Sequence, residues 1–315
     1  MNNRTNNNIE LTVIIPITER YDPVSELFYE YKRGIDGTGL TYEIIYVLDG
    51  ENPQALEELE NLQKSENLSI IGLAKFFGEA TALNAAFSQA SGNIFLTLPA
   101  YQQIEADEIP KLVAAIKDCD MVLARRWPRR DSILNRLQTR LFNSLLRLST
   151  DLDIHDAGCS ARVFTRNVID DVQLYGDLHR FFPVMAHRQG FRVIELDVNQ
   201  AEKDIHRRIY APGLYIRRLL DLLTIFFLVK FTKKPLRFFG LVGTSLFGIG
   251  VIGSLFVIGQ RLFLDISLAD RPALILSSLL IVLGVQIIAI GLIGEIIIFT
   301  HARDLKEYKI DKIIN

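Results

Sequence analysis

A run of arginines is the densest set of potential ligand-binding side chains in the sequence. Residues 125–130 read Arg-Arg-Trp-Pro-Arg-Arg, and Arg136 continues the basic character along a predicted helix over residues 133–148. Guanidinium groups bind phosphate through paired N–H donors, so the run predicts a phosphate site on a lipid or a nucleotide. A solvated basic face that contacts no ligand is the alternative interpretation.

The elements that position this run alternate between strand and helix. Short apolar segments predict strands over residues 10–15, 42–48, 68–73, 93–98 and 121–124. Helices are expected over residues 24–33, 54–65, 78–89 and 107–117. Nearly continuous apolar strands separated by helices indicate a doubly wound, mostly parallel α/β sheet with helices on both faces.

Ligands of such sheets bind beyond the carboxyl ends of the strands. In this sequence those ends are residues 16–20, 49–52, 74–78 and 99–103. We therefore expect a binding site where these segments meet.

Two long uncharged segments near the C-terminus predict membrane helices. Residues 238–260 and 273–294 carry no charged side chain, and a helix of roughly 20 residues crosses the core of a bilayer. Basic residues flank the pair at Lys230, Lys233, Lys234, Arg237, Arg303, Lys306, Lys309 and Lys312. This bias predicts an integral membrane protein whose N-terminal domain and both termini are cytoplasmic. Residues 214–231 are expected to form an amphipathic helix along the membrane surface rather than a third span.

Charge and cysteine content exclude other classes of protein. The 35 Lys and Arg residues nearly balance the 37 Asp and Glu residues, and the net charge of −2 argues against nucleic acid as a partner. Cys119 and Cys159 lack the spacing of a zinc site or a disulfide framework, which fits a reducing compartment. Residues 1–10 lack an apolar core, so we expect no cleavable signal peptide.

Several short motifs occur in a fixed order along the chain. They are residues 13–16 (Val-Ile-Ile-Pro), 47–51, 77–87, 90–93, 155–162, 177–183, 190–195, 234–240 and 291–295. Together they resemble the family-2 glycosyltransferases, specifically their membrane-anchored polyprenyl-phosphate branch, the dolichol-phosphate-mannose-synthase-like enzymes. The resemblance extends from about residue 11 to 308, which is most of the chain.

This resemblance implies a GT-A (Rossmann-like) fold, a nucleotide-sugar donor and a polyprenyl phosphate acceptor that attacks the anomeric carbon with inversion. The family also uses Mg²⁺ or Mn²⁺ held by an Asp-x-Asp motif. By the resemblance, the nucleotide-sugar-binding residues are Pro16, Thr18, Glu19, Asp49, Gly50, Lys75, Gly78, Asn84, Ala100 and Gln103. The lipid-phosphate-binding residues are expected to be Arg125, Arg126, Arg129, Arg130, Arg136, Arg162 and Lys203. A homo-oligomer is also expected.

The metal motif itself departs from the family pattern. The family's Leu-Asp-Ala-Asp-Leu-Gln aligns with Leu-Pro-Ala-Tyr-Gln-Gln, so Pro99 and Tyr101 replace both aspartates. Neither side chain substitutes well for a carboxylate on a hard divalent cation, so we predict no metal site and assign no cofactor or catalytic residue. The alternative is a site rebuilt from Asp49, Glu51 or Glu105. Three further positions depart from the family pattern. Leu48 replaces the first acid of the nucleotide turn, and Glu19-Arg20 replaces the family's Asn-Glu. Residues 203–210 replace the family's Arg-x-x-Gly-x-Ser-Lys-Tyr.

Two functions are compatible with these residues. One is a transferase that makes a polyprenyl-phosphate sugar. The other is a catalytically silent homologue that acts as a membrane scaffold or regulatory subunit. The expected organisation is a disordered N-terminus (1–8), a family-2 glycosyltransferase domain (9–210), a juxtamembrane amphipathic helix (211–234), a two-helix transmembrane domain (235–300) and a cytoplasmic tail (301–315).

Overall fold

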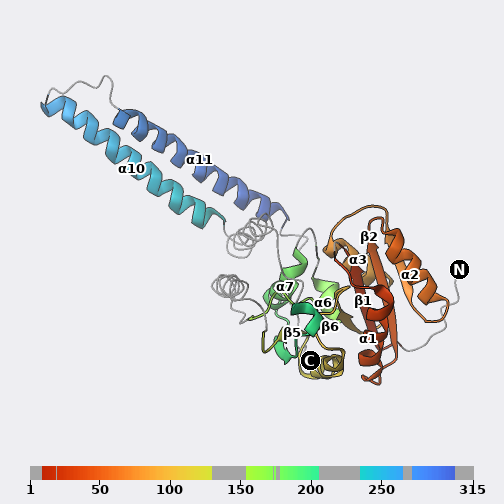
Figure 1. Cartoon of the computed structure of the whole chain (residues 1–315). Coiled ribbons are helices and arrows are strands. Elements are labelled where there is room, and N and C mark those ends of the chain that lie inside the picture. Colours follow the sequence, from red (N-terminus) through yellow and green to blue (C-terminus); the bar gives the residue numbers. More distant parts are fainter. Residues whose placement is uncertain are drawn as a thin grey trace. The chain divides into compact units, whose positions relative to one another are not determined.

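The chain consists of two compact units, Met1–Leu222 with Glu307–Asn315 and Leu223–Lys306, which we describe separately (Figure 1). The computed structural model describes residues 9–18, 20–129, 154–172, 174, 178–205, 235–264 and 272–301. The predictions for residues 1–8, 133–148, 211–234 and 302–315 fall outside these ranges, as do those for Glu19, Arg130 and Arg136.

The first unit is built on one seven-stranded sheet with the order β3-β2-β1-β4-β6-β5-β7. The strands are β1 (Leu11–Ile17), β2 (Tyr42–Asp49), β3 (Ser69–Leu73), β4 (Ile94–Thr97), β5 (Met121–Arg126), β6 (Arg162–Thr165) and β7 (Val193–Val198). Strand β6 is antiparallel to β4 and β5, whereas all the other neighbours are parallel. The prediction of a mostly parallel sheet is therefore confirmed.

Helices connect the strands, and the first four of them lie near the predicted positions, whereas the three helices described after β6 in this unit were not predicted. The helices are α1 (Val24–Asp36), α2 (Pro53–Gln63), α3 (Glu79–Gln89), α4 (Ile109–Ala114), α6 (Arg166–Asp171), α7 (Phe182–Arg188) and α8 (Glu202–Ile205). The helix expected over residues 107–117 is divided into η1 (Ala106–Glu108), α4 and η2 (Ala115–Asp118). Pro110 stands in the first turn of α4, where its missing N–H is tolerated and a new helix can begin.

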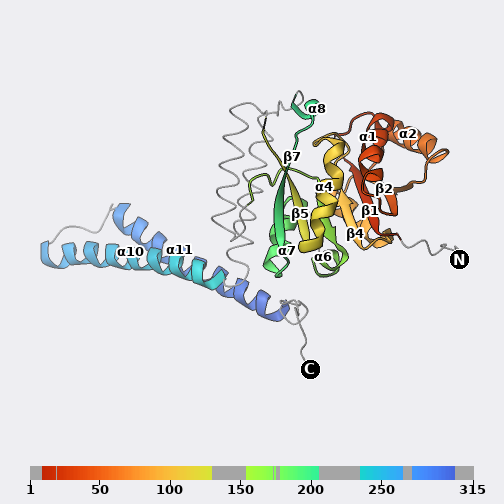
Figure 2. The same ribbon diagram turned by 90° about the horizontal axis from the view of Figure 1, so that it is seen from below.

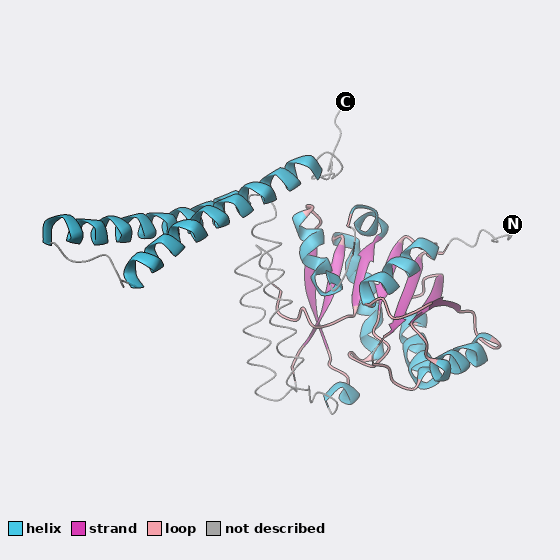
Figure 3. Cartoon of the chain, turned by 90° about the horizontal axis from the view of Figure 1, so that it is seen from above, coloured by secondary structure: helices cyan, strands magenta, loops and turns pink. Residues whose placement is uncertain are grey.

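The two faces of the sheet carry different helices. Successive residues of a strand point to opposite faces, so Phe95 and Leu96 of β4 mark the two sides. Leu96 belongs to a buried apolar cluster with side chains of α1, α2 and α4, and Figure 2 shows α4 beside α1. On the other face, the Phe95 and Phe164 rings stack 5.7 Å apart and pack against Phe87 of α3. Figure 3 shows the strands with helices on both sides, as expected for a doubly wound sheet.

The second unit contains two long helices, α10 (Pro235–Leu264) and α11 (Pro272–His301). Both are long and apolar enough to cross a membrane, and they contain the two predicted uncharged segments. The helices approach closely at small residues. A Cβ atom added to Gly284 would lie 2.6 Å from the backbone nitrogen of Phe247, and one added to Gly243 would lie 2.7 Å from the carbonyl oxygen of Gly284. Such close backbone approach is typical of helix pairs in membranes.

The one acidic side chain of this helix pair within the described residues, Glu295, contacts the start of α10. Its Oε2 atom accepts a hydrogen bond of 3.3 Å from the backbone nitrogen of Leu236, in the first turn of α10. A carboxylate in this position satisfies an N–H that has no partner within its own helix, and it favours the positive end of the helix dipole.

Candidate functional site

The carboxyl ends of β1, β2, β3 and β4 lie at one edge of the sheet because these neighbouring strands are parallel. Asp49 is the last residue of β2, and its carboxylate accepts hydrogen bonds from the backbone nitrogens of Phe77 (2.7 Å) and Gly78 (2.8 Å). Gly78 has a φ of 96°, a conformation that glycine adopts readily. Asp49 thus holds the loop after β3 against the end of β2.

The same loop packs against Gly50. A Cβ atom on Gly50 would lie 3.0 Å from the backbone nitrogen of Phe76 and 3.4 Å from the carbonyl carbon of Lys75. The fold therefore brings together four residues predicted to bind the nucleotide-sugar, namely Asp49, Gly50, Lys75 and Gly78. Lys75 is exposed there.

The segment after β4, which carries the altered metal motif, is held by hydrogen bonds from other elements. The hydroxyl of Tyr31 on α1 donates to the carbonyl oxygens of Pro99 and Tyr101, each 3.0 Å away. The carboxylate of Asp22 accepts a bond of 3.1 Å from the backbone nitrogen of Gln102. These bonds fix the backbone on which the Tyr101 side chain stands.

Gln103, a predicted ligand residue, is buried and links this segment to the start of β6. Its side chain donates to the Tyr101 hydroxyl (2.6 Å) and accepts from the backbone nitrogen of Ser160 (2.8 Å). Ala100, also predicted, is buried. Both residues therefore lie inside the protein and support this edge of the sheet.

Arg20 follows β1 and lies over the ring of Tyr101. Its guanidinium carbon is 3.8 Å from the ring centre, which is within the range of a cation–π contact. Of the other predicted residues of this strand end, Pro16 is buried within β1 and Thr18 follows it half-buried.

Arg126 lies inside the protein, in a cluster of ion pairs. Its Nε and Nη2 atoms contact the two carboxylate oxygens of Asp156 at 2.7 and 2.8 Å, and its Nη1 atom lies 3.0 Å from Asp204. The Arg126 side chain is only 1% exposed. Arg129 joins the cluster, with Nη1 3.5 Å from Asp156.

The charges of this cluster stabilise one another. Burial raises the pKa of Asp156, but the adjacent Arg126 outweighs this effect and lowers that pKa to about 2. Because Arg126 is buried and paired, it does not present its guanidinium to a lipid phosphate, which corrects the prediction made from the basic run.

The other predicted lipid-phosphate residues occupy different environments. Arg162 is also buried, where its Nη1 atom donates to the carbonyl oxygen of His179 (2.6 Å). It too is turned inward. Arg125 lies 3.4 Å from Asp197, and Lys203 lies 3.4 Å from Glu30 and is 56% exposed. Among the described basic residues, Arg126 and Arg162 thus point inward, Arg129 lies at the margin of the buried cluster, and Arg125 and Lys203 remain at the surface.

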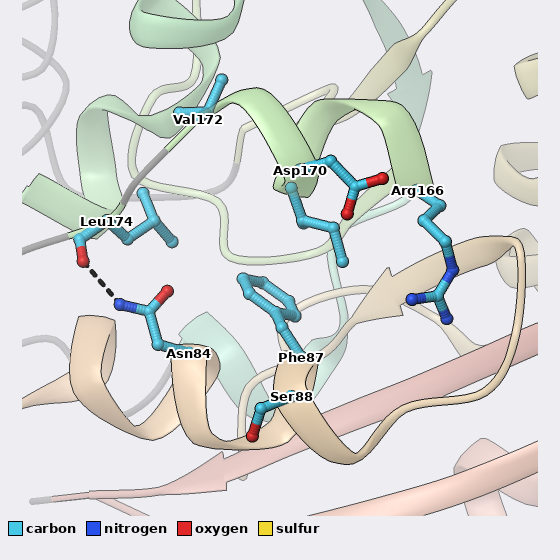
Figure 4. A pocket seen from close by; sticks show the side chains of 8 residues that line it. Asn84, Phe87, Ser88, Arg166, Asp170, Val172 and Leu174 are labelled. Carbon is cyan, nitrogen blue, oxygen red and sulfur yellow. Dashed lines mark hydrogen bonds between the residues drawn. The ribbon is translucent and has the colours of Figure 1, made fainter. Parts of the chain in front are cut away.

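Asn84, predicted to bind the nucleotide-sugar, takes part in a different contact. Its side-chain nitrogen donates to the carbonyl oxygen of Leu174 (2.5 Å), and it lines a pocket of about 370 Å³ with Phe87, Arg166 and Asp170 (Figure 4). Its polar contact is therefore with the segment after α6, and among the described residues it forms no hydrogen bond to the loop that Asp49 holds.

Comparison with known proteins identifies the family. Residues 12–173 match the family Glycosyl transferase family 2. An undecaprenyl-phosphate 4-deoxy-4-formamido-L-arabinose transferase of Proteus mirabilis is 30% identical over 312 residues, covering 97% of this chain and 94% of the relative. The chain belongs to glycosyl transferase family 2. A transferase of the same name from Aeromonas hydrophila is 30% identical over 316 residues, with 98% of this chain and 95% of the relative covered.

A solved structure of the same architecture is that of glucosyl-3-phosphoglycerate synthase from Mycobacterium tuberculosis. It matches with a TM-score of 0.51 and 13% identity over 69% of this chain and 78% of that one. This likeness establishes the fold. The first unit of this family member is thus a GT-A-like α/β domain with a seven-stranded sheet.

This family member does not match the family's metal site. Among the described residues, no three His, Cys, Asp or Glu side chains lie close enough together to hold a metal ion. Pro99 offers no side-chain ligand, and its carbonyl oxygen accepts a bond from Tyr31. The Tyr101 ring lies against the positively charged guanidinium of Arg20. The Asp49 oxygens each already accept a backbone N–H. The described residues therefore do not fit a divalent cation at this position.

Sequence reasoning omitted three residues that shape these sites. Arg20 was aligned with a family acid but not assigned a role, although this exchange of charge was itself a signal. Asp156 and Asp204 are separated from Arg126 by 30 and 78 residues, and no local pattern joins them.

Proposed function

We propose that this chain transfers a sugar from a nucleotide-sugar to polyprenyl phosphate at the cytoplasmic face of a membrane. The observation that carries the proposal is that its likeness to transferases named for undecaprenyl phosphate spans 97% of the chain, including both apolar helices. The sheet edge with Asp49, Gly50, Lys75 and Gly78 supplies the expected place for the nucleotide.

The acceptor is already an anion, so the reaction needs little from a protein base. A phosphate oxygen of the lipid forms a bond to the anomeric carbon while the bond from that carbon to the donor's diphosphate oxygen breaks. The electron pair leaves with the nucleoside diphosphate, and the configuration at the anomeric carbon inverts. Binding and orientation of the two phosphate groups are then the main task of the protein.

For the lipid phosphate, we retain Arg125 and Lys203, which remain at the surface, and Arg129, which is 12% exposed beside Asp156. Arg130 and Arg136, which lie outside the described ranges, are also retained. Arg126 and Arg162 are left out because they bond within the protein. Membrane integration with the N-terminal domain and both termini in the cytoplasm is part of the same proposal, supported by the basic flanks of the apolar pair. The homo-oligomer stays a prediction.

The test is transfer by the purified full chain in lipid vesicles that contain undecaprenyl phosphate. A panel of labelled UDP-, GDP-, CDP- and dTDP-sugars is supplied in turn, and label is extracted into butanol. We expect transfer from one donor to give a butanol-soluble product and to release the nucleoside diphosphate of that donor. Mild acid should then hydrolyse the butanol-soluble product.

A catalytically silent homologue is the second candidate, and the replacement of both motif aspartates by Pro99 and Tyr101 favours it. It predicts no transfer from any donor, together with co-purification of a second transferase. Product formation by the chain alone would exclude it.

A further inference from the structure

The positively charged side chain of Arg20 lies beside the segment that replaces the family's metal motif. Tyr101 stands at the second aspartate position of that motif, and the Arg20 guanidinium lies 3.8 Å from the centre of its ring. Arg20 itself stands where the family has a glutamate. The exchange of acid for base at Arg20 and the loss of both motif aspartates act in the same direction, since each makes this edge of the sheet more positive.

Among the described residues, the N–H groups of Arg20 donate no hydrogen bond, and its contact is with the Tyr101 ring. A guanidinium group is planar and carries five N–H donors in its plane, whereas stacking uses only its face. Paired donors of this kind match two phosphate oxygens. Within the described residues, Arg20 has no ion pair, whereas Arg33 on α1 pairs with Asp107.

The platform beneath Arg20 is rigid. Tyr31 binds the backbone carbonyls of Pro99 and Tyr101, and buried Gln103 donates to the Tyr101 hydroxyl at 2.6 Å. A cation held on a fixed ring needs little reorganisation when an anion binds, which is the property that electrostatic stabilisation of a leaving group requires.

Two carboxylates near this edge bind backbone N–H groups. Both oxygens of Asp49 accept backbone N–H groups of the loop after β3, and Asp22 accepts the backbone N–H of Gln102. Exposed Lys75, on the loop that Asp49 holds, adds a second positive charge at this edge. Arg20 and Lys75 therefore favour an anionic ligand at this edge.

We propose that Arg20, stacked on Tyr101, binds the diphosphate of the donor in place of a divalent cation. The proposal rests on the proposed function. As the bond between the anomeric carbon and the diphosphate oxygen breaks, the negative charge gained by the nucleoside diphosphate is stabilised by the Arg20 N–H groups. No proton is transferred in this step.

Calorimetric titration of the full chain in detergent tests the proposal, with UDP, CDP, GDP, ADP and dTDP as probes, first in EDTA and then in excess MnCl₂. We expect one diphosphate to bind in EDTA and MnCl₂ to change its affinity by less than about twofold. Arg20→Gln should weaken binding about tenfold or more, as expected for loss of a charge-assisted contact. Arg33 is an exposed arginine elsewhere on the surface, so the control variant Arg33→Gln should bind the diphosphate as tightly as the unchanged protein.

A second pair of variants separates loss of binding from loss of folding. Tyr101→Phe retains the ring but loses the bond from Gln103, so it should lose less affinity than Tyr101→Ala, which should weaken binding in the same direction as Arg20→Gln. The melting midpoint of each variant, followed by Trp127 fluorescence, verifies that it is folded.

Three results would overturn the proposal: a tenfold or greater gain in affinity with MnCl₂, full affinity in folded Arg20→Gln, or no binding of any probe. The transfer assay on the same preparations separates the two claims. Transfer with MnCl₂-dependent binding would refute the role of Arg20 and leave the function standing. Binding through Arg20 in EDTA without any transfer would refute the function and leave the site standing.

Discussion

Replacing Arg126 by methionine is expected to lower the free energy of unfolding by about 3–5 kcal/mol, the range measured when one partner of a buried ion pair is removed. Asp156 and Asp204 are at most 1% exposed, so both carboxylates would lose their main cationic partner away from water. Methionine retains most of the side-chain length, which limits the contribution of an empty cavity. For a unit of this size, the loss corresponds to a midpoint about 6–20 °C lower.

Arg125→Met is the matched control because it removes the neighbouring charge on the same strand. Arg125 pairs with Asp197, whose side chain is 53% exposed, and pairs at the surface contribute about 0–1 kcal/mol. The assay is thermal unfolding of the full chain in detergent, followed by the fluorescence of Trp127, the only tryptophan. Equal midpoints for the two variants would refute the buried-cluster assignment.

The pH dependence of the unfolding midpoint of the same variants provides a second test. Arg126 lowers the folded pKa of Asp156 to about 2, below the value of about 3.9 for an unfolded aspartate, so the pair stabilises the fold fully above about pH 4. That contribution is lost as the pH falls toward 2. The difference in midpoint between the unchanged protein and Arg126→Met should therefore narrow below about pH 4. A difference that widens on acidification would contradict the assigned sign.

Three further predictions concern the apolar helix pair. Gly284→Leu should destabilise the pair by about 1–3 kcal/mol through overpacking, whereas Gly248→Leu, which has open space around it, should not; thermal unfolding in detergent distinguishes them. Glu295→Ala should cost about 0.5–2 kcal/mol through loss of its bond to the start of α10, and Glu295→Gln should restore part of it, as measured by the same midpoint. A cysteine placed at Ser267, in a background without Cys119 and Cys159, should react with an impermeant reagent from the non-cytoplasmic side, and a cysteine at Glu60 from the cytoplasmic side; the reverse pattern would overturn the topology.

The sequence predicted the elements whose signals are local. The strands β1, β2 and β3 were found because each is a continuous apolar run, and the helices α10 and α11 were found because each contains an uncharged segment long enough to cross a bilayer core. Strand β6 has four residues and begins with Arg162, so it lacks such a signal. Its antiparallel place between β4 and β5 depends on pairing across the sheet, which no local pattern encodes.

The sequence placed a residue correctly where its position follows from the end of a strand, and it misplaced or omitted a residue whose side chain depends on distant partners. The contacts of Gly50 and Gly78 follow from the strand ends that precede them. Arg126 was interpreted as a surface residue because its neighbours in sequence are basic, while its partners are remote along the chain. The stacking of Arg20 on Tyr101 likewise joins the ends of two strands, β1 and β4, that only the sheet order makes neighbours.

The initial rate of sugar transfer to undecaprenyl phosphate in EDTA tests the central claim most directly. The full chain in vesicles, given its preferred donor, should form the butanol-soluble product in EDTA at a rate that MnCl₂ changes by less than about twofold, and Arg20→Gln should lower that rate about tenfold or more. Absence of product from every donor, with and without MnCl₂, by a chain that melts cooperatively would contradict the account.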